Sequence, residues 1–132
     1  MIEWTQSLRY GNDGYVWIHN TSHTLLAHPF RKESIGKDDA KQKKKKGVFI
    51  IQDFVQKALQ SKDDKGSFVE YYWSKPHAKN SSKKISYVAL FAPWNWVVGT
   101  GVYQDDIEHE IALKKKEMKE RMDRYVFGVM MI

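Results

Sequence analysis

Histidines near the start of the chain could hold a metal ion. His19 and His23 flank a polar turn, and His28 follows five residues later. Imidazole nitrogens bind zinc, but protein zinc sites need three or four ligands, usually with thiolate or carboxylate partners. The chain has no cysteine, and no cluster of carboxylates accompanies these histidines. We therefore expect no metal site.

A pair of carboxylates, Asp105 and Asp106, could in principle serve in acid–base catalysis. They fall in the first turn of an expected helix. Carboxylates there can cap the free N–H groups of the helix and are stabilised by the positive end of its dipole. The Gly-Thr-Gly sequence at 99–101 lies inside an expected strand, which is the wrong context for a dinucleotide site. We expect neither an enzyme nor a bound cofactor.

Aromatic side chains are concentrated in two short segments, 67–75 and 92–103, and offer a different chemistry. These are Tyr71, Tyr72, Trp73, Trp94, Trp96 and Tyr103. Large flat rings with polar edges suit a core that also forms a small pocket. In the second segment Gly99 and Gly101 are two residues apart, so both lack a side chain on the same face of a strand. Either a packed helix or a ligand is expected to approach the backbone there.

The length and charge limit the class of protein. A chain of 132 residues is expected to form one domain with one core. The net charge of +6 rests largely on the run KQKKKKG at 41–47, which has no aromatic residue to stack on a base. The four arginines, which are the usual readers of base edges, are scattered. This run is expected to be a solvated loop or frayed helix end, with a phosphate or anionic-lipid contact as the alternative.

Hydrophobic periodicity predicts an α+β fold with antiparallel strands. A helical spacing is followed by the apolar residues Ile50, Ile51, Phe54, Val55, Ala58 and Leu59. A second helix is expected from residue 104 onward. Runs of β-branched and aromatic residues separated by polar turns predict five strands. These runs are residues 14–20, 24–28, 67–75, 84–92 and 95–103.

Six motifs, in this order and spacing, resemble the single Cache sensor domain of the second type. They are RYGNDGYVWIHN, LLAHPF, GVFIIQDFVQKA, SFVEYYWSKP, KISYVALFAPWNWVVGTGVY and DDIE, within residues 8 to about 110. This family lies outside the membrane in bacterial chemoreceptors and sensor kinases. The resemblance implies a PAS-like sheet of five antiparallel strands, a long N-terminal helix behind it, and a pocket in front of it. Many members bind small carboxylates.

A buried carboxylate must be paired with a cation or with several N–H and O–H donors. On the resemblance, the candidate ligand-binding residues are Trp17, His28, Tyr71, Trp73, Lys84, Tyr87 and Tyr103. Each aromatic residue could instead belong only to the core, His28 could cap its strand, and Lys84 could be a solvated loop lysine. Because both faces of the sheet are expected to be covered, the consecutive residues 71–73 are all expected to be buried.

The resemblance also implies an organisation along the chain. We expect a sensor domain at 1–104 with most of its N-terminal helix missing, a signalling helix at 105–125, and the possible start of a truncated transmembrane helix at 126–132. The family's Asp-Gly turn is replaced by Asn20–His23. A sheet that lacks its helical cover would expose an apolar face, which favours association.

The expected function is extracytoplasmic sensing of a small organic anion at the inner membrane. Acetate, propionate, lactate and pyruvate are the expected ligands, and the output would be that of a chemoreceptor or a sensor histidine kinase. The expected partners are the ligand, the membrane through flanking helices, and a second copy in the full receptor, with no nucleic acid. The alternative is a basic module that binds a membrane surface or nucleic acid, whose affinity would fall steeply with salt.

Overall fold

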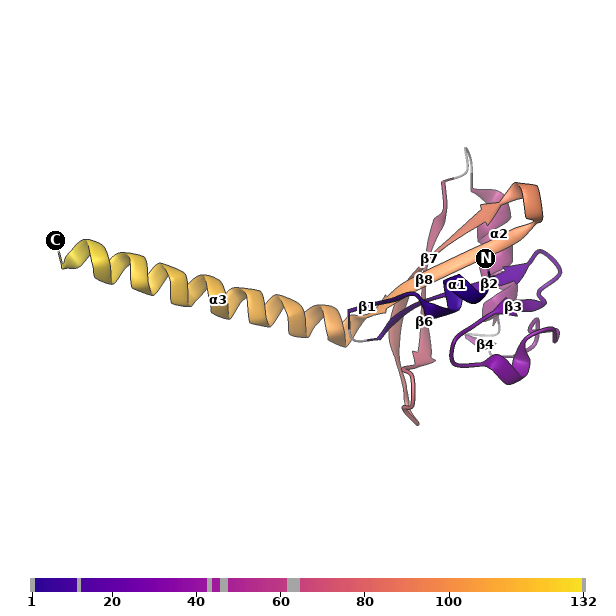
Figure 1. Ribbon diagram of the computed structural model, residues 1–132, viewed down its shortest axis with the longest axis horizontal. Helices are drawn as coiled ribbons and strands as arrows, with labels where there is room; N and C mark the ends of the chain where they lie inside the picture. The colour runs from indigo at the N-terminus through magenta and orange to yellow at the C-terminus, as the bar shows by residue number, and fades with distance from the viewer. Residues whose placement is uncertain (1, 12, 43, 46–47, 62–64, 132) are drawn as a thin grey trace.

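The computed structural model describes residues 2–11, 13–42, 44–45, 48–61 and 65–131. One antiparallel sheet forms the body of the molecule, helix α2 packs on one face, and helix α3 extends away from it (Figure 1). The predicted α+β fold with an antiparallel sheet is therefore confirmed.

The sheet has six strands in the order β1-β2-β8-β7-β6, with β3 also paired to β2. All pairings between neighbouring strands are antiparallel. The five expected strands are present, and the two-residue β1 is an addition. Their bounds are β1 (Arg9–Tyr10), β2 (Gly14–Asn20), β3 (Leu25–Ala27), β6 (Ser67–Ser74), β7 (Ser81–Phe91) and β8 (Trp96–Tyr103).

Helix α2 (Ile50–Gln60) covers one face of the sheet with its apolar side. Five of its six expected apolar residues are buried against aromatic residues of the strands. The sixth, Leu59, is 54% exposed, so its expected place on the buried face was wrong. A shorter helix, α1 (Ile2–Ser7), contacts β2 and β3. The long connection from β3 to α2 contains a turn of 3-10 helix, η1 (Lys32–Ser34), and a small ribbon of β4 (Lys44–Lys45) and β5 (Val48–Phe49). The lysine run therefore lies partly in this ribbon, while residues 43, 46 and 47 fall outside the described residues.

Strand β6 is buried on one side only. Val69, Tyr71 and Trp73 point toward α2, whereas Phe68 and Tyr72 are exposed. The expectation that residues 71–73 are all buried was wrong, because Tyr72 is 55% exposed. Successive side chains of a strand alternate between faces, and α2 covers only the face that Tyr71 and Trp73 share.

The two glycines of β8 allow neighbouring side chains to lie against the strand. A Cβ atom on Gly99 would overlap the ring of Trp17 from β2, and one on Gly101 would overlap Ser86 from β7. The expectation of a packed helix or a ligand at these glycines was wrong, because residues of the neighbouring strands β2 and β7 fill the space. In the turn between β7 and β8, the 3-10 helix η2 (Ala92–Trp94) places Trp94 between the rings of Phe91 and Trp96.

Helix α3 (Gln104–Met130) begins directly after β8 and continues beyond residue 125 without a break. Its side chains are mostly exposed, and it projects away from the sheet (Figure 1). Among the described residues, no helix is both long enough and apolar enough to cross a membrane. The expected start of a transmembrane segment at 126–132 stays a prediction, and Ile132 lies outside the described residues.

Candidate ligand-binding site

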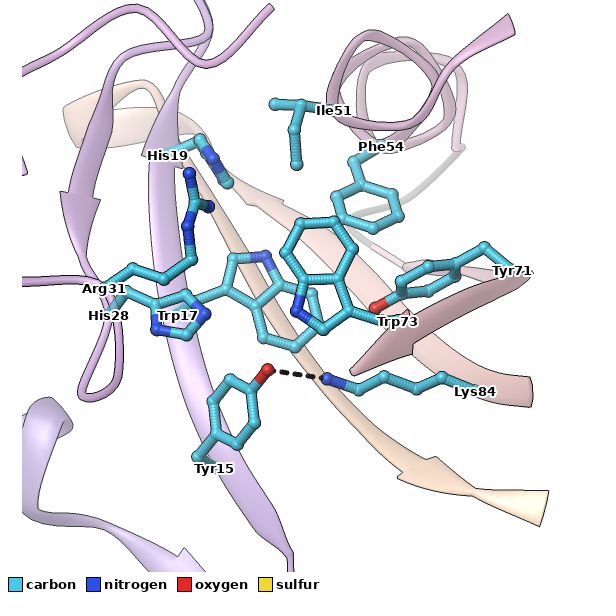
Figure 2. Close-up of a pocket in the computed structure, with 10 residues that line it drawn as sticks. All are labelled: Tyr15, Trp17, His19, His28, Arg31, Ile51, Phe54, Tyr71, Trp73 and Lys84. Carbon is cyan, nitrogen blue, oxygen red and sulfur yellow. Dashed lines mark hydrogen bonds between the residues drawn. The ribbon is translucent and has the colours of Figure 1, made fainter. Parts of the chain in front are cut away.

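A small cavity lies between α2, the sheet, and the segment that follows β3 (Figure 2). Its walls are mostly aromatic, with two cationic side chains. The lining residues are Tyr15, Trp17 and His19 of β2, His28 and Arg31 of the following segment, Ile51 and Phe54 of α2, Tyr71 and Trp73 of β6, and Lys84 of β7. Alternation along β2 and β6 brings every second side chain to this face.

The cavity itself is narrow. It leaves about 10 Å³ for the centre of a water molecule, which is near the lower limit for holding one water. A wider cleft of about 210 Å³ adjoins it and shares four of its residues, namely Tyr15, His28, Arg31 and Trp73. Arg31 and Trp73 stand together at this boundary, with the guanidinium carbon 5.7 Å from the centre of the indole ring.

Lys84 is a buried cation-forming group in the cavity wall, with a side chain that is 1% exposed. Its Nζ donates a hydrogen bond to Tyr15 Oη at 3.1 Å (Figure 2). The rings of Tyr15, Trp17 and Tyr103 surround the amine at 4.2, 4.6 and 5.1 Å from their centres. No carboxylate of the described residues forms an ion pair with Lys84. Burial lowers the pKa of this amine to about 7.

The second cation, Arg31, has a counter-ion. Its Nη1 and Nη2 atoms donate to the two carboxylate oxygens of Asp39 at 2.9 and 2.6 Å. His19 Nε2 donates to the same carboxylate at 2.8 Å. Burial alone would raise the pKa of Asp39, but the hydrogen bonds from His19 and Arg31 outweigh it and hold this pKa at about 2. Burial also lowers the pKa of His19, so we assign a neutral imidazole beside an ionised Asp39.

His28 is a neutral donor in the same wall. Its Nδ1 accepts a hydrogen bond from the backbone N–H of Phe30 at 3.1 Å, so the ring proton resides on Nε2. Burial, reinforced by the positive charge of Arg31, lowers the pKa of His28 to about 3. The imidazole thus stays uncharged at neutral pH.

Two buried nitrogens of the lining residues have unused hydrogen-bonding capacity. Among the buried side-chain atoms of the part of the chain that the structure describes, Trp17 Nε1 and His19 Nδ1 lack a hydrogen-bond partner. An unsatisfied buried polar group costs about 1–3 kcal/mol, so a ligand with an acceptor for Trp17 would gain from meeting it.

The structure brings five of the seven candidate residues to this cavity: Trp17, His28, Tyr71, Trp73 and Lys84. Tyr103 lies beside it, with its ring near Lys84 Nζ and its hydroxyl donating to the Ser74 carbonyl. Tyr87 lies outside the cavity, because it is out of phase with Lys84 along β7; it is 37% exposed on the other face and accepts a hydrogen bond from the Gly66 N–H.

Sequence reasoning missed several lining residues. Tyr15 and His19 share a strand face with Trp17, so the period of two along β2 was a usable signal. Arg31 and Asp39 lie in an irregular connection that has no periodicity, and no pattern in the sequence pointed to them.

An antiparallel sheet with a small cavity beneath the connection that follows its second hairpin strand defines a PAS-like ligand-sensing domain. The family model of the Cache domain matches residues 1–128, and the chain belongs to this family. It is a Cache sensor domain of the kind found in chemotaxis proteins and sensor histidine kinases.

Two curated relatives illustrate the family. The chain is 33% identical to the methyl-accepting chemotaxis protein McpP of Pseudomonas putida over 116 residues, 88% of this chain and 21% of that protein. It is 30% identical to the sensor histidine kinase MctS of Rhizobium johnstonii over 118 residues, 89% of this chain and 25% of that protein. The chain therefore spans about a fifth to a quarter of the length of these relatives.

Two solved structures share the fold at comparable identity. One is described as the periplasmic sensor domain of a chemotaxis protein, with a TM-score of 0.70, 31% identity, and coverage of 77% of this chain and 69% of that one. The other is described as the structural basis for carboxylic acid recognition by a Cache chemosensory domain. It has a TM-score of 0.69 and 34% identity, and covers 78% of this chain and 68% of that one.

Proposed function

We propose that this domain binds a small organic anion, a short carboxylate such as acetate, propionate, lactate or pyruvate, and passes the event to α3. The observation that carries this proposal is Lys84, a buried amine without an ion-pair partner among the described residues. Burying a lone charge is costly, and a carboxylate supplies the missing opposite charge.

The other lining groups complete an anion site. Tyr15 Oη already contacts Lys84, and the Trp17 and His28 N–H groups lie in the same wall. Charge-assisted hydrogen bonds from such donors are stronger than neutral ones. The aromatic walls suit the short apolar part of the ligand. A structure described by its carboxylic acid recognition, at 34% identity, supports this ligand class.

Binding requires the cavity to widen, because its present volume fits about one water. The adjoining cleft shares Arg31 and Trp73 with the cavity. An outward movement of these two side chains would join the two spaces, so we infer that the ligand enters from this side.

We further propose that the domain works outside the cytoplasm, at the inner membrane, as the sensor of a chemoreceptor or a sensor histidine kinase that functions as a dimer. The named relatives, one chemotaxis protein and one sensor kinase, support this setting. In this arrangement 1–104 is the sensor, 105–125 the signalling helix, and 126–132 the start of a membrane segment.

Titration calorimetry with acetate, propionate, lactate and pyruvate tests the ligand class. A ligand of about six heavy atoms gains at most roughly 1.5 kcal/mol per atom, so its dissociation constant is expected to be no tighter than about micromolar. Lys84→Met should weaken binding by roughly ten- to more than hundredfold, since a charged hydrogen bond contributes about 1.5–3 kcal/mol.

Lys83→Met is the matched control, because Lys83 is the neighbouring lysine and lies half-exposed beside Glu70. It should bind like the parent. Absence of binding by all four carboxylates would remove the proposed ligand class, and unchanged affinity in Lys84→Met would show that other donors hold the anion.

A further inference from the structure

Asp39 is a buried carboxylate at the back of the cavity wall, with 1% of its surface exposed. It accepts two hydrogen bonds from Arg31 and one from His19, both of which line the cavity. Its backbone N–H also donates to the His23 carbonyl at 2.9 Å, so its position is fixed from two sides.

The bidentate hydrogen bond with Asp39 neutralises the positive charge of Arg31 within the protein. Among the ten lining residues, Arg31 and the protonated form of Lys84 are the cations, and both histidines have lowered pKa values and are neutral near pH 7. Arg31 is neutralised by Asp39, which leaves Lys84 as the lining cation that has no counter-ion among the residues the structure describes. A ligand with one carboxylate balances this charge, whereas a second carboxylate would meet the field of Asp39.

We propose that Asp39 is the specificity-determining residue that restricts this site to ligands with a single carboxylate. The inference rests on the proposed function, because it concerns the same cavity. Asp39 does so through Arg31: it holds the guanidinium as an internal ion pair and so withholds it from a second ligand carboxylate.

Pyruvate and oxalate are suitable probes, because each has six non-hydrogen atoms and they differ by one negative charge at neutral pH. We expect the parent to bind pyruvate at least tenfold more tightly than oxalate. In Asp39→Asn the amide oxygen can still accept hydrogen bonds from Arg31 and His19, but the amide NH2 group cannot accept from Arg31 and the negative charge is lost. The ratio of the oxalate to the pyruvate dissociation constant should then fall at least tenfold.

Asp38→Asn is the matched control, because it makes the same change of charge at the preceding residue, which is exposed. It should retain the parent ratio, which separates the role of Asp39 from an effect of net charge. The double variant Arg31→Gln/Asp39→Asn again leaves Lys84 as the lining cation and should restore the preference for pyruvate.

Each result decides between the two claims. If the parent binds no carboxylate, the proposed function fails. If the parent binds oxalate as tightly as pyruvate, or if a folded Asp39→Asn keeps the parent ratio, the role of Asp39 is overturned while the proposed function stands. If Asp39→Asn does not fold, as judged by circular dichroism, the parent ratio and the double variant carry the test, and a double variant that favours oxalate overturns it.

Discussion

Burial of Lys84 ties the stability of the domain to pH. Its pKa is about 7 in the folded chain, because burial disfavours the charged amine, against an ordinary value of 10.5. Between these values the unfolded chain holds more protons, so the free energy of unfolding should rise with pH, by at most about 1.4 kcal/mol per unit. Below pH 7 both states are protonated and this slope vanishes.

Chemical denaturation at pH 7, 8 and 9 measures this slope. It should be present in the parent and in Lys83→Met and absent in Lys84→Met. The series stops at pH 9 because burial raises the pKa of Tyr15 to about 12, which lowers stability once the unfolded tyrosine ionises near pH 10. A slope that persists in Lys84→Met would show that a group other than Lys84 causes the pH dependence of stability.

Carboxylate affinity should also depend on pH. A bound anion favours the protonated amine and raises the pKa of Lys84 above its value in the free domain. As pH rises above about 7, binding must take up a proton, and affinity should fall by at most tenfold per unit. Calorimetry with propionate at pH 6, 8 and 9 would show this, and a constant affinity across the series would speak against an ionic role for Lys84.

Gly99 matters because it makes room for Trp17. A Cβ atom there overlaps the indole ring, so Gly99→Ala should displace Trp17 and cost about 1–3 kcal/mol of stability, as overpacking does. Ligand affinity should weaken with it. Gly128→Ala in α3 meets no atom within 4 Å and should be neutral or slightly stabilising. Equal melting temperatures for Gly99→Ala and the parent would contradict the close fit of Trp17 against β8.

The lining residues that lie in strands could be predicted from the sequence better than those in irregular segments. Trp17, Tyr71, Trp73 and Lys84 were named on the resemblance to the Cache family, and the structure places all four in the cavity wall. The sheet face on which Tyr87 lies depends on the register of β7 with its neighbouring strands. Because both faces of the sheet carry apolar residues, the hydrophobic pattern does not determine this register. Asp39 lies in an irregular connection whose conformation is fixed by side-chain hydrogen bonds. Such a segment has no hydrophobic periodicity, so its position could not be predicted from the sequence.

At the scale of elements, the junction between β6, β2 and α3 is held by Lys75. Its Nζ lies 2.9 Å from Asp105, 2.9 Å from Asp106 and 3.6 Å from Asp13. The hydrogen bond with Asp106 is the main cause of the raised pKa of Lys75. Trp73, two residues before Lys75, lines the cavity, so this ion cluster joins the ligand site to the first turn of α3.

Lys75→Met leaves three carboxylates close together without their cation. We expect a loss of stability on the order of 1 kcal/mol, which diminishes at high salt as the repulsion is screened. Thermal melts at low and high salt measure both effects. Lys119→Met removes an exposed pair with Asp123 within α3 and serves as the control, with no change in melting temperature. A loss that is independent of salt would argue for packing rather than charge.

The main elements themselves were predictable, because α2 and the long strands carry strong local periodicity. The faces of β6 were not, since an aromatic residue on either side of a strand has the same local signature. Its exposed side follows from the position of α2, which is a property of the tertiary structure.

At the scale of the whole molecule, the sheet face opposite α2 carries a patch of exposed apolar side chains. Its members and their exposed fractions are Phe68 at 72%, Tyr72 at 55%, Phe91 at 44%, Val102 at 40% and Tyr87 at 37%. The rings of Phe68 and Tyr87 pack edge to face across β6 and β7. Exposed patches of this kind mark interaction sites.

We expect this patch to drive self-association of the chain. Light scattering over a range of concentrations should show a mass that rises above that of the monomer. Phe68→Ser/Tyr72→Ser should shift the equilibrium to the monomer without loss of fold, because both side chains lie at the surface. A parent that stays monomeric at every concentration would contradict the expectation.

Helix α3 starts at Gln104, and β8 ends at Tyr103, with no residue between them to act as a flexible joint. Tyr103 in turn lies against the Lys84 amine. A helix of 27 residues is about 40 Å long. Because the helix continues directly from β8, a tilt of about 3° of the strand end at Tyr103 would move the far end of the helix by about 2 Å, from the same geometry. A rearrangement around Lys84 that is too small to alter the sheet would then still produce a measurable displacement at the C-terminal end of α3.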